Sequence, residues 1–162
     1  MEKIRLGRTN LMVSRSGFGA LPIQRVSLDE ARLILRKAYE NGFNFFDTAR
    51  GYTDSEDKIG YALSDVRKDI YIATKTPAND RVSVLRDIET SLEKMKTDYV
   101  DILQLHNPKQ LPDPNDPESA YSGLVEARKK GLARFIGITS HKLSLALEGS
   151  AGVLWDRCEG QV

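Results

Sequence analysis

The sequence predicts an α/β fold, an incomplete (β/α)8 TIM barrel with about five parallel strands and surrounding helices, preceded by a short N-terminal hairpin. Three apolar runs predict strands that end on titratable residues, namely Asp47, Lys75 and His106. Helical patterns fill the gaps between these runs, as in parallel sheets with crossover helices. The 162 residues are too few for a closed barrel, which takes about 250. We therefore expect part of a barrel whose strand ends meet on one rim.

The elements are predicted in chain order, beginning with a hairpin over residues 4–14, where apolar patches flank a polar turn that contains glycine. The first strand runs near residues 15–20, and its glycines allow another group to approach the backbone closely. Ser27 and Glu30 form a capping-box pattern before an apolar helical face, so the first helix spans residues 28–41. Further strands are expected at 43–47, 70–75, 99–106 and 133–138, and further helices at 58–63, 81–96, 121–131 and 143–147.

The C-terminal end departs from this pattern. Gly149 and Gly152 stand where the fifth helix should continue, as an altered reading frame or a spliced end would place them. The predicted division is a partial barrel over residues 1–148 and an atypical tail over 149–162. Five strands do not close a barrel, so the first and fifth strands would be exposed edges. We expect an open sheet, a fragment, or a piece that self-associates through its open sheet edges, and we favour truncation.

Composition argues against several classes of partner. Lys and Arg number 24 against 23 Asp and Glu, a formal net charge of +1, so we expect neither a nucleic acid nor a membrane partner. The single cysteine, Cys158, excludes an internal disulfide and favours a reducing, cytoplasmic location. His106, His141 and Cys158 lack the spacing of metal ligands, so no metal site is predicted.

Several motifs resemble, in order and spacing, those of the aldo/keto reductase family. The matching segments are Leu6-Gly7-Arg8-Thr9, Asp47-Thr48-Ala49 with Tyr52, Ser55-Glu56, Ile59-Gly60-Tyr61-Ala62-Leu63, Thr74-Lys75, Asp98-Tyr99-Val100-Asp101 with His106, and Ile136-Gly137-Ile138-Thr139-Ser140. The resemblance runs from about residue 4 to about residue 148. It implies a rim active site that reduces a small carbonyl substrate with NADPH, NADH being the alternative cofactor.

Asp47, Tyr52, Lys75 and His106 together have the chemistry of a carbonyl-reducing site. Tyr52 is the expected general acid, and Lys75 the cation that makes a tyrosine, with an ordinary pKa of about 10, a better proton donor. Asp47 would hold the ammonium group in an ion pair, and His106 would orient the carbonyl by donating a hydrogen bond to its oxygen. The alternatives are a surface tyrosine, a solvated lysine and a structural histidine.

The resemblance also implies cofactor contacts. Gly19 and Ala20 stand where the family lays its cofactor against the first strand, and Asp47 is a further expected cofactor contact. Thr139 and Ser140 would hydrogen-bond the amide of the nicotinamide ring. The family more often has Ser-Asn at this point, so the chain keeps a hydroxyl and loses a side-chain amide. The alternative for this pair is an N-cap of the following helix.

Three functions remain open at this point. The first is an NAD(P)H-dependent oxidoreductase that reduces an aldehyde or ketone carbonyl to an alcohol. The second is a truncated, non-catalytic aldo/keto reductase relative that acts, if at all, through self-association. The third is a lyase that forms a Schiff base through Lys75, and it is disfavoured because Asp47 would keep that lysine charged and unreactive.

Overall fold

The computed structural model describes residues 1–151 and 155–160, with the backbone alone for 157–160. At its centre is a six-stranded sheet in the order β3-β4-β5-β6-β7-β8. The strands of this sheet are β3 (Phe18–Gly19), β4 (Phe45–Asp47), β5 (Tyr71–Thr76), β6 (Val100–His106), β7 (Ala133–Ser140) and β8 (Arg157–Gly160). The helices are α1 (Leu28–Glu40), α2 (Ser55–Leu63), α3 (Arg81–Met95), α4 (Ala120–Lys129) and α5 (Leu143–Ala151), with short 3-10 helices η1 (Gly7–Thr9), η2 (Pro22–Arg25) and η3 (Ser64–Asp69).

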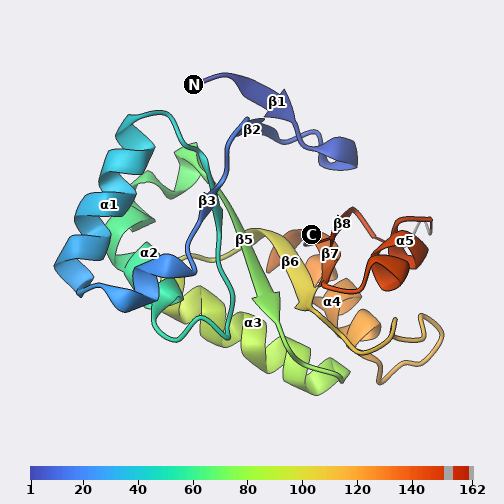
Figure 1. Ribbon diagram of the computed structural model, residues 1–162. Helices are drawn as coiled ribbons and strands as arrows, with labels where there is room; N and C mark the ends of the chain where they lie inside the picture. The colour runs from blue at the N-terminus through green and yellow to red at the C-terminus, as the bar shows by residue number, and fades with distance from the viewer. Residues whose placement is uncertain (152–154, 161–162) are drawn as a thin grey trace.

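The expected α/β fold is confirmed, because the five predicted strands are neighbours in chain order and all pair in parallel. Figure 1 shows the helices arranged around the outside of the sheet, as in part of a barrel. Helix α1 begins at the capping box that the sequence predicts, since Ser27 and Glu30 satisfy each other's backbone N–H groups. Strand β7 continues two residues beyond its expected end, to Ser140.

The sixth strand was not expected, and it corrects the prediction that the fifth strand is an open edge. Strand β8 pairs in parallel with β7, from Gly137 opposite Arg157 to Ser140 opposite Gly160. Trp155, just before β8, is buried and its ring meets that of Tyr121 edge-on at 5.2 Å. Helix α5 also runs through Gly149 to residue 151, so Gly149 does not end it, and Gly152 lies outside the described residues. The division at residue 148 itself stays a prediction.

Two apolar cores lie on the two faces of the sheet. The larger core lies between the strands and the helices and includes Leu35, Phe46, Ile59, Ile88, Met95 and Leu124. The smaller core joins Phe45, Ala73 and Ile102 on the inner face to Leu11 and Val13 of the N-terminal hairpin. That hairpin consists of β1 (Lys3–Arg5) and β2 (Met12–Ser14), which pair antiparallel as predicted. It covers the inner face, so this face is less open than five strands alone would leave it.

The strand patterns predict that the apolar inner face of the sheet is made by Phe43, Phe45, Val100, Ile102 and Phe135. For two of these residues the prediction is wrong. Phe43 and Val100 pack with the helix-side core instead. Phe43 precedes its strand, so the sheet does not yet set the direction of its side chain. Val100 is the first residue of β6 and lies opposite Ala133, which packs in the same core. Phe45, Ile102 and Phe135 do lie on the inner face.

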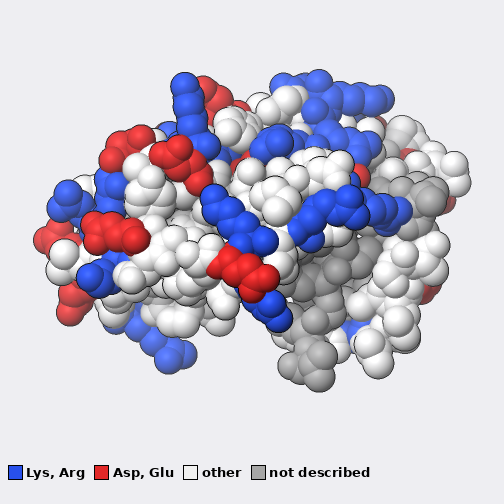
Figure 2. All heavy atoms as spheres, turned by 90° about the horizontal axis from the view of Figure 1, so that it is seen from above, with Lys and Arg blue, Asp and Glu red and all other residues white. Residues whose placement is uncertain are grey.

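The surface on the hairpin side carries both signs of charge. Figure 2, which looks down on the molecule from above, shows Lys and Arg side chains interspersed with Asp and Glu. None of the described helices is long and apolar enough to cross a bilayer.

Candidate functional site

The structure brings Asp47, Tyr52, Lys75 and His106 together on one rim of the sheet. Asp47 and His106 are the last residues of β4 and β6, Lys75 lies near the end of β5, and Tyr52 lies in the loop between β4 and α2. Lys75 Nζ donates a 2.5 Å hydrogen bond to Asp47 Oδ1 and lies 5.2 Å from the centre of the Tyr52 ring. The Tyr52 and His106 rings meet edge-on, with centroids 5.6 Å apart and planes at 83°. The four groups therefore form a continuous series of contacts, from Asp47 through Lys75 and Tyr52 to His106.

Lys75 is held as a charged group. Its side chain is 1% exposed and that of Asp47 is 25% exposed, so the ion pair is largely shielded from water. Lys75 Nζ also donates to the carbonyl oxygen of Thr48 at 2.8 Å. A buried ammonium is stable only when it is paired and hydrogen-bonded, and both conditions are met here. This arrangement counts against a neutral, nucleophilic lysine and hence against the Schiff-base lyase.

His106 is half-buried at the rim and is biased toward its neutral form. Burial lowers the pKa of His106 below the ordinary 6.5, and the positive charges of Lys75 and His141 lower it further. A neutral imidazole carries one N–H, which it can donate to an oxygen atom. The edge-on contact with Tyr52 places the imidazole ring beside the phenol ring.

A tight loop presents Tyr52. The backbone N–H of Tyr52 donates to the carbonyl of Ala49 at 3.0 Å, and the Tyr52 carbonyl accepts from the N–H of Ser55 at 2.8 Å. Thr53 between them has a positive φ of 43°, which is uncommon for a residue with a side chain and reverses the chain direction before α2. Because the ring contacts both Lys75 and His106, Tyr52 does not fit the alternative of a surface tyrosine.

Two of the residues expected to contact the cofactor, Gly19 at the end of β3 and Ala20 directly after it, differ in exposure. Gly19 is exposed, pairs with Asp47 in the sheet, and has open space where a Cβ would stand. It lines a cavity of about 360 Å³ between the hairpin and the rim, which Phe45 and Asp47 also line. Ala20 is fully buried, its N–H donates to the Asp47 carbonyl, and its own carbonyl accepts from Ser55 Oγ. Ala20 thus has little to offer a ligand.

Thr139 and Ser140 are buried at the end of β7 and already make protein hydrogen bonds. Thr139 lies opposite His106 in the ladder, and its Oγ1 donates to the Leu105 carbonyl and accepts from the N–H of Asn107. Ser140 Oγ accepts from the N–H of Lys142, just before α5, which supports the alternative of a turn that precedes this helix. That bond leaves the hydroxyl proton of Ser140 available to a ligand.

Sequence reasoning gave no role to Glu56, which is buried behind the site. Its carboxylate pairs with Arg50 and accepts a hydrogen bond from Thr74, the residue before Lys75. The signal was present in the sequence. Ile59, Gly60 and Leu63 lie three, four and seven positions after Glu56, so a helix places this carboxylate on its apolar side.

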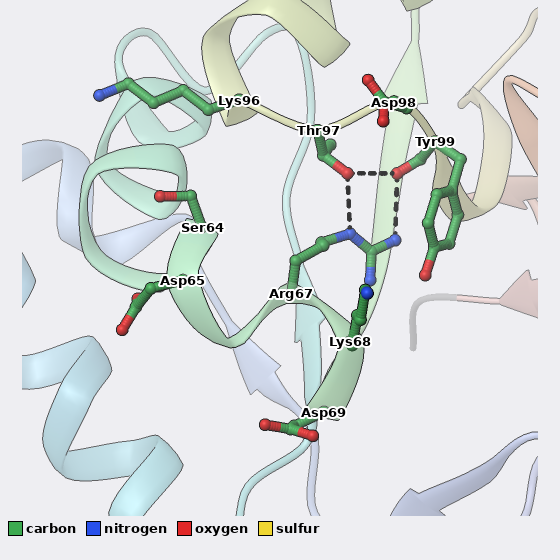
Figure 3. A pocket seen from close by; sticks show the side chains of 9 residues that line it. All are labelled: Ser64, Asp65, Arg67, Lys68, Asp69, Lys96, Thr97, Asp98 and Tyr99. Atoms are coloured by element: carbon green, nitrogen blue, oxygen red, sulfur yellow. Dashed lines mark hydrogen bonds between the residues drawn. The ribbon is translucent and has the colours of Figure 1, made fainter.

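A second cavity, of about 540 Å³, lies at the opposite ends of the strands (Figure 3). Arg67 donates from Nε to Thr97 Oγ1 and from Nη2 to the Tyr99 carbonyl, and Figure 3 draws both bonds together with the bond from Thr97 Oγ1 to the same carbonyl. Arg67 also pairs with the buried Asp101. Lys68 lines the same cavity together with further groups of both signs. The guanidinium of Arg67 is thus engaged in holding the fold.

Among the described residues there is also no group of three or more metal ligands.

Comparison with known proteins gives one consistent match. A family model described as the aldo/keto reductase family matches residues 15–148. The chain is 35% identical over 160 residues to L-galactose dehydrogenase of Arabidopsis thaliana, covering 90% of this chain and 50% of that protein. It is 35% identical over 123 residues to methylglyoxal reductase DkgA of Yersinia pestis, covering 73% and 43%.

Solved structures agree with the sequence matches. The holo form of the aldo-keto reductase AKR11C1 from Bacillus halodurans superposes with a TM-score of 0.78 at 30% identity, over 91% of this chain and 53% of that chain. The chain therefore spans about half the length of the relatives it matches.

Proposed function

The chain belongs to the aldo/keto reductase family, whose members use NAD(P)H for carbonyl reduction, and from this premise we propose that its rim site reduces an aldehyde or ketone to an alcohol. The observation that carries the proposal is the position of Tyr52, which lies between a buried, charged Lys75 and a half-buried His106. A phenol between a fixed cation and a hydrogen-bond donor is suited to give up a proton.

The reaction needs one hydride at the carbonyl carbon and one proton at the carbonyl oxygen. The nicotinamide, when bound, supplies the hydride. The Tyr52 hydroxyl supplies the proton, and the resulting phenolate is stabilised by the Lys75 ammonium until solvent reprotonates it. His106, neutral because its pKa is lowered, donates its N–H to the same oxygen and stabilises the charge that develops there. Asp47 keeps the ammonium in place and is not itself consumed.

The residues present fit the nicotinamide end of NADPH in two respects. Gly19 opens the wall of the cavity beside Asp47, and Ser140 keeps a hydroxyl proton for the ring carboxamide. Thr139 fits less well, because its hydroxyl both donates and accepts within the protein. We expect weak binding, with a dissociation constant above about 100 μM, or less than about 6 kcal/mol of binding energy. We propose NADPH rather than NADH as the cofactor, and this preference rests only on the resemblance to the aldo/keto reductase family.

A small carbonyl compound is the proposed substrate class. One relative is named as a methylglyoxal reductase and another as an L-galactose dehydrogenase, so small aldehydes and sugars are sensible first candidates. We also propose a cytoplasmic location, because a chain with a single cysteine cannot form an internal disulfide and suits a reducing compartment.

The test is oxidation of NADPH, at millimolar concentration, in the presence of methylglyoxal. Turnover should fall by about 10² to 10⁴ in Tyr52→Phe, with cofactor affinity nearly unchanged. Tyr61→Phe is the matched control, because Tyr61 lies exposed on α2, and it should keep full turnover. Equal rates in the two variants would remove Tyr52 from the mechanism. A folded wild-type chain that binds NADPH without turnover would favour the non-catalytic alternative.

One structural feature supports the second candidate function, self-association. The described part of β3 pairs with β4 alone, so its other edge offers backbone groups to a second strand. The cavity between the hairpin and the rim lies beside this edge. We therefore expect dimers or larger species by sedimentation at micromolar concentration. A compact monomer at all concentrations would count against an associating edge.

A further inference from the structure

The first turn of α2 holds a buried carboxylate that the proposed reaction does not use. The side chain of Glu56 is 1% exposed. Its Oε1 accepts a 2.7 Å hydrogen bond from Thr74 Oγ1, and its Oε2 forms an ion pair with Arg50 Nη1. Arg50 is itself only partly exposed, so the pair is largely shielded from solvent.

Both partners of Glu56, Thr74 and Arg50, lie next to residues of the proposed site. Thr74 immediately precedes Lys75 on β5. Arg50 lies two residues before Tyr52, and its backbone N–H donates to the Lys75 carbonyl at 2.9 Å. The carboxylate thus joins the loop that carries Tyr52 to the strand that carries Lys75.

Other residues at the start of α2 make different connections. Ser55 Oγ bonds to Thr48 and to the Ala20 carbonyl, and Lys58 Nζ donates to the Ile23 carbonyl. These bonds secure α2 to the end of β3 and to the turn after it. Glu56 reaches the opposite way, to β5, and so fixes the loop from its other side.

Stability alone does not account for an ion pair at this position. Replacing a buried ion pair with apolar residues of similar volume is often neutral or stabilising. The helix already packs through Ile59, Ala62 and Leu63, which are all buried. The charged pair instead contributes geometry. Charge-assisted hydrogen bonds to one carboxylate fix the positions of both partners, Arg50 and Thr74, relative to each other.

We propose that Glu56 is a positioning residue, which holds the Tyr52 loop against β5 and thereby sets the contacts of Tyr52 with Lys75 and His106. The inference rests on the proposed function only in that Tyr52 is taken as the acid. The contacts themselves can be measured without turnover.

The test compares two buried carboxylates by NMR. Glu56→Gln keeps the size of the side chain and removes its charge. Asp101→Asn is the matched control, because Asp101 is equally buried and paired with Arg67 and Arg134, at the opposite ends of the strands. The chain has two histidines, so His141→Gln assigns the remaining imidazole signal to His106. The edge-on Tyr52 ring makes this signal a reporter of the position of Tyr52.

We expect Glu56→Gln to move the His106 imidazole signal, and Asp101→Asn to leave it in place. An unmoved signal in Glu56→Gln, or an equal movement in Asp101→Asn, would overturn the positioning role. If Glu56→Gln does not fold, Thr74→Val removes one of the two bonds to the same carboxylate, and the same two outcomes apply.

Turnover gives a second readout. Glu56→Gln should lower kcat by about 10- to 100-fold with little change in KM, since a displaced acid affects the chemical step more than binding. If the wild-type chain turns over and Glu56→Gln has the same kcat, the inference is also overturned. If the wild-type chain does not turn over at all, the proposed function fails, while the His106 signal still decides the role of Glu56.

Discussion

Replacing Lys75 with methionine tests the electrostatic core of the proposed mechanism. The substitution keeps an unbranched side chain of similar length and removes the ammonium group that lies 5.2 Å from the Tyr52 ring centre. At an effective dielectric constant of about 20, a unit charge at that distance stabilises a phenolate by about 3 kcal/mol. The loss of this amount in the transition state corresponds to a fall in kcat of about 10²-fold.

The same substitution has a cost in stability that must be separated from the catalytic effect. Asp47 would lose its ammonium partner, and breaking a buried pair costs about 3 to 5 kcal/mol. Asp47 is one-quarter exposed, so water replaces part of the interaction and we expect the lower end of this range. Circular dichroism and urea unfolding of Lys75→Met therefore accompany the rate measurement.

Lys94→Met is the control for this experiment. Lys94 also donates a 2.5 Å hydrogen bond to a carboxylate, that of Asp57, but both side chains are partly exposed. Its removal should cost less than about 1 kcal/mol and leave kcat unchanged. A folded Lys75→Met protein that keeps kcat within about threefold of wild type would refute the role of Lys75 in stabilising the phenolate.

Three further predictions concern pH, packing and the C-terminal segment. The lowered pKa of His106 means that the unfolded chain binds a proton at higher pH than the folded chain does, so the free energy of unfolding should fall as pH drops below about 6.5. His106→Gln should show a smaller fall between pH 7.5 and 5 in urea titrations, and an identical profile would contradict the shift. Gly60→Ala should destabilise the fold by about 1 to 3 kcal/mol, because an added Cβ would lie 2.3 Å from the carbonyl oxygen of Lys94 on α3. Gly19→Ala, at an open position, is its control in the same unfolding assay and should cost less than about 1 kcal/mol. Trp155→Ala should cost about 3 to 5 kcal/mol if the buried ring belongs to the core, and a change below about 1 kcal/mol would show that this segment is dispensable.

The sequence predicts the strands that carry the site because their patterns are local. Each of Asp47, Lys75 and His106 follows a short apolar run, and parallel pairing then brings the three ends together. The neighbourhood of Tyr52 follows from the same rule, since its loop starts at the end of β4. These predictions needed only the period of the apolar residues and the direction of the strands.

Other features depend on distant contacts and so leave little trace in a local pattern. The segment that becomes β8 is four residues long and contains charged residues and a glycine, which predicts no strand by itself. It is paired because β7 offers a free edge. The link between Glu56 and Thr74 spans 18 positions, and the sequence gives the burial of the carboxylate but not its partner.

The hydrogen bond from Arg8 Nη2 to the carbonyl oxygen of Trp155 joins positions 147 apart in the chain. Strands β3 to β7 can be added one after another as a nascent chain emerges, since each pairs with the strand before it. The hairpin region around Arg8 is made first, yet it obtains this partner only after almost all of the described chain has been synthesised. During translation, therefore, the apolar side chains of the hairpin can pack on Phe45, Ala73 and Ile102 well before this hydrogen bond forms, so the bond should be among the last contacts that the hairpin makes with the described chain.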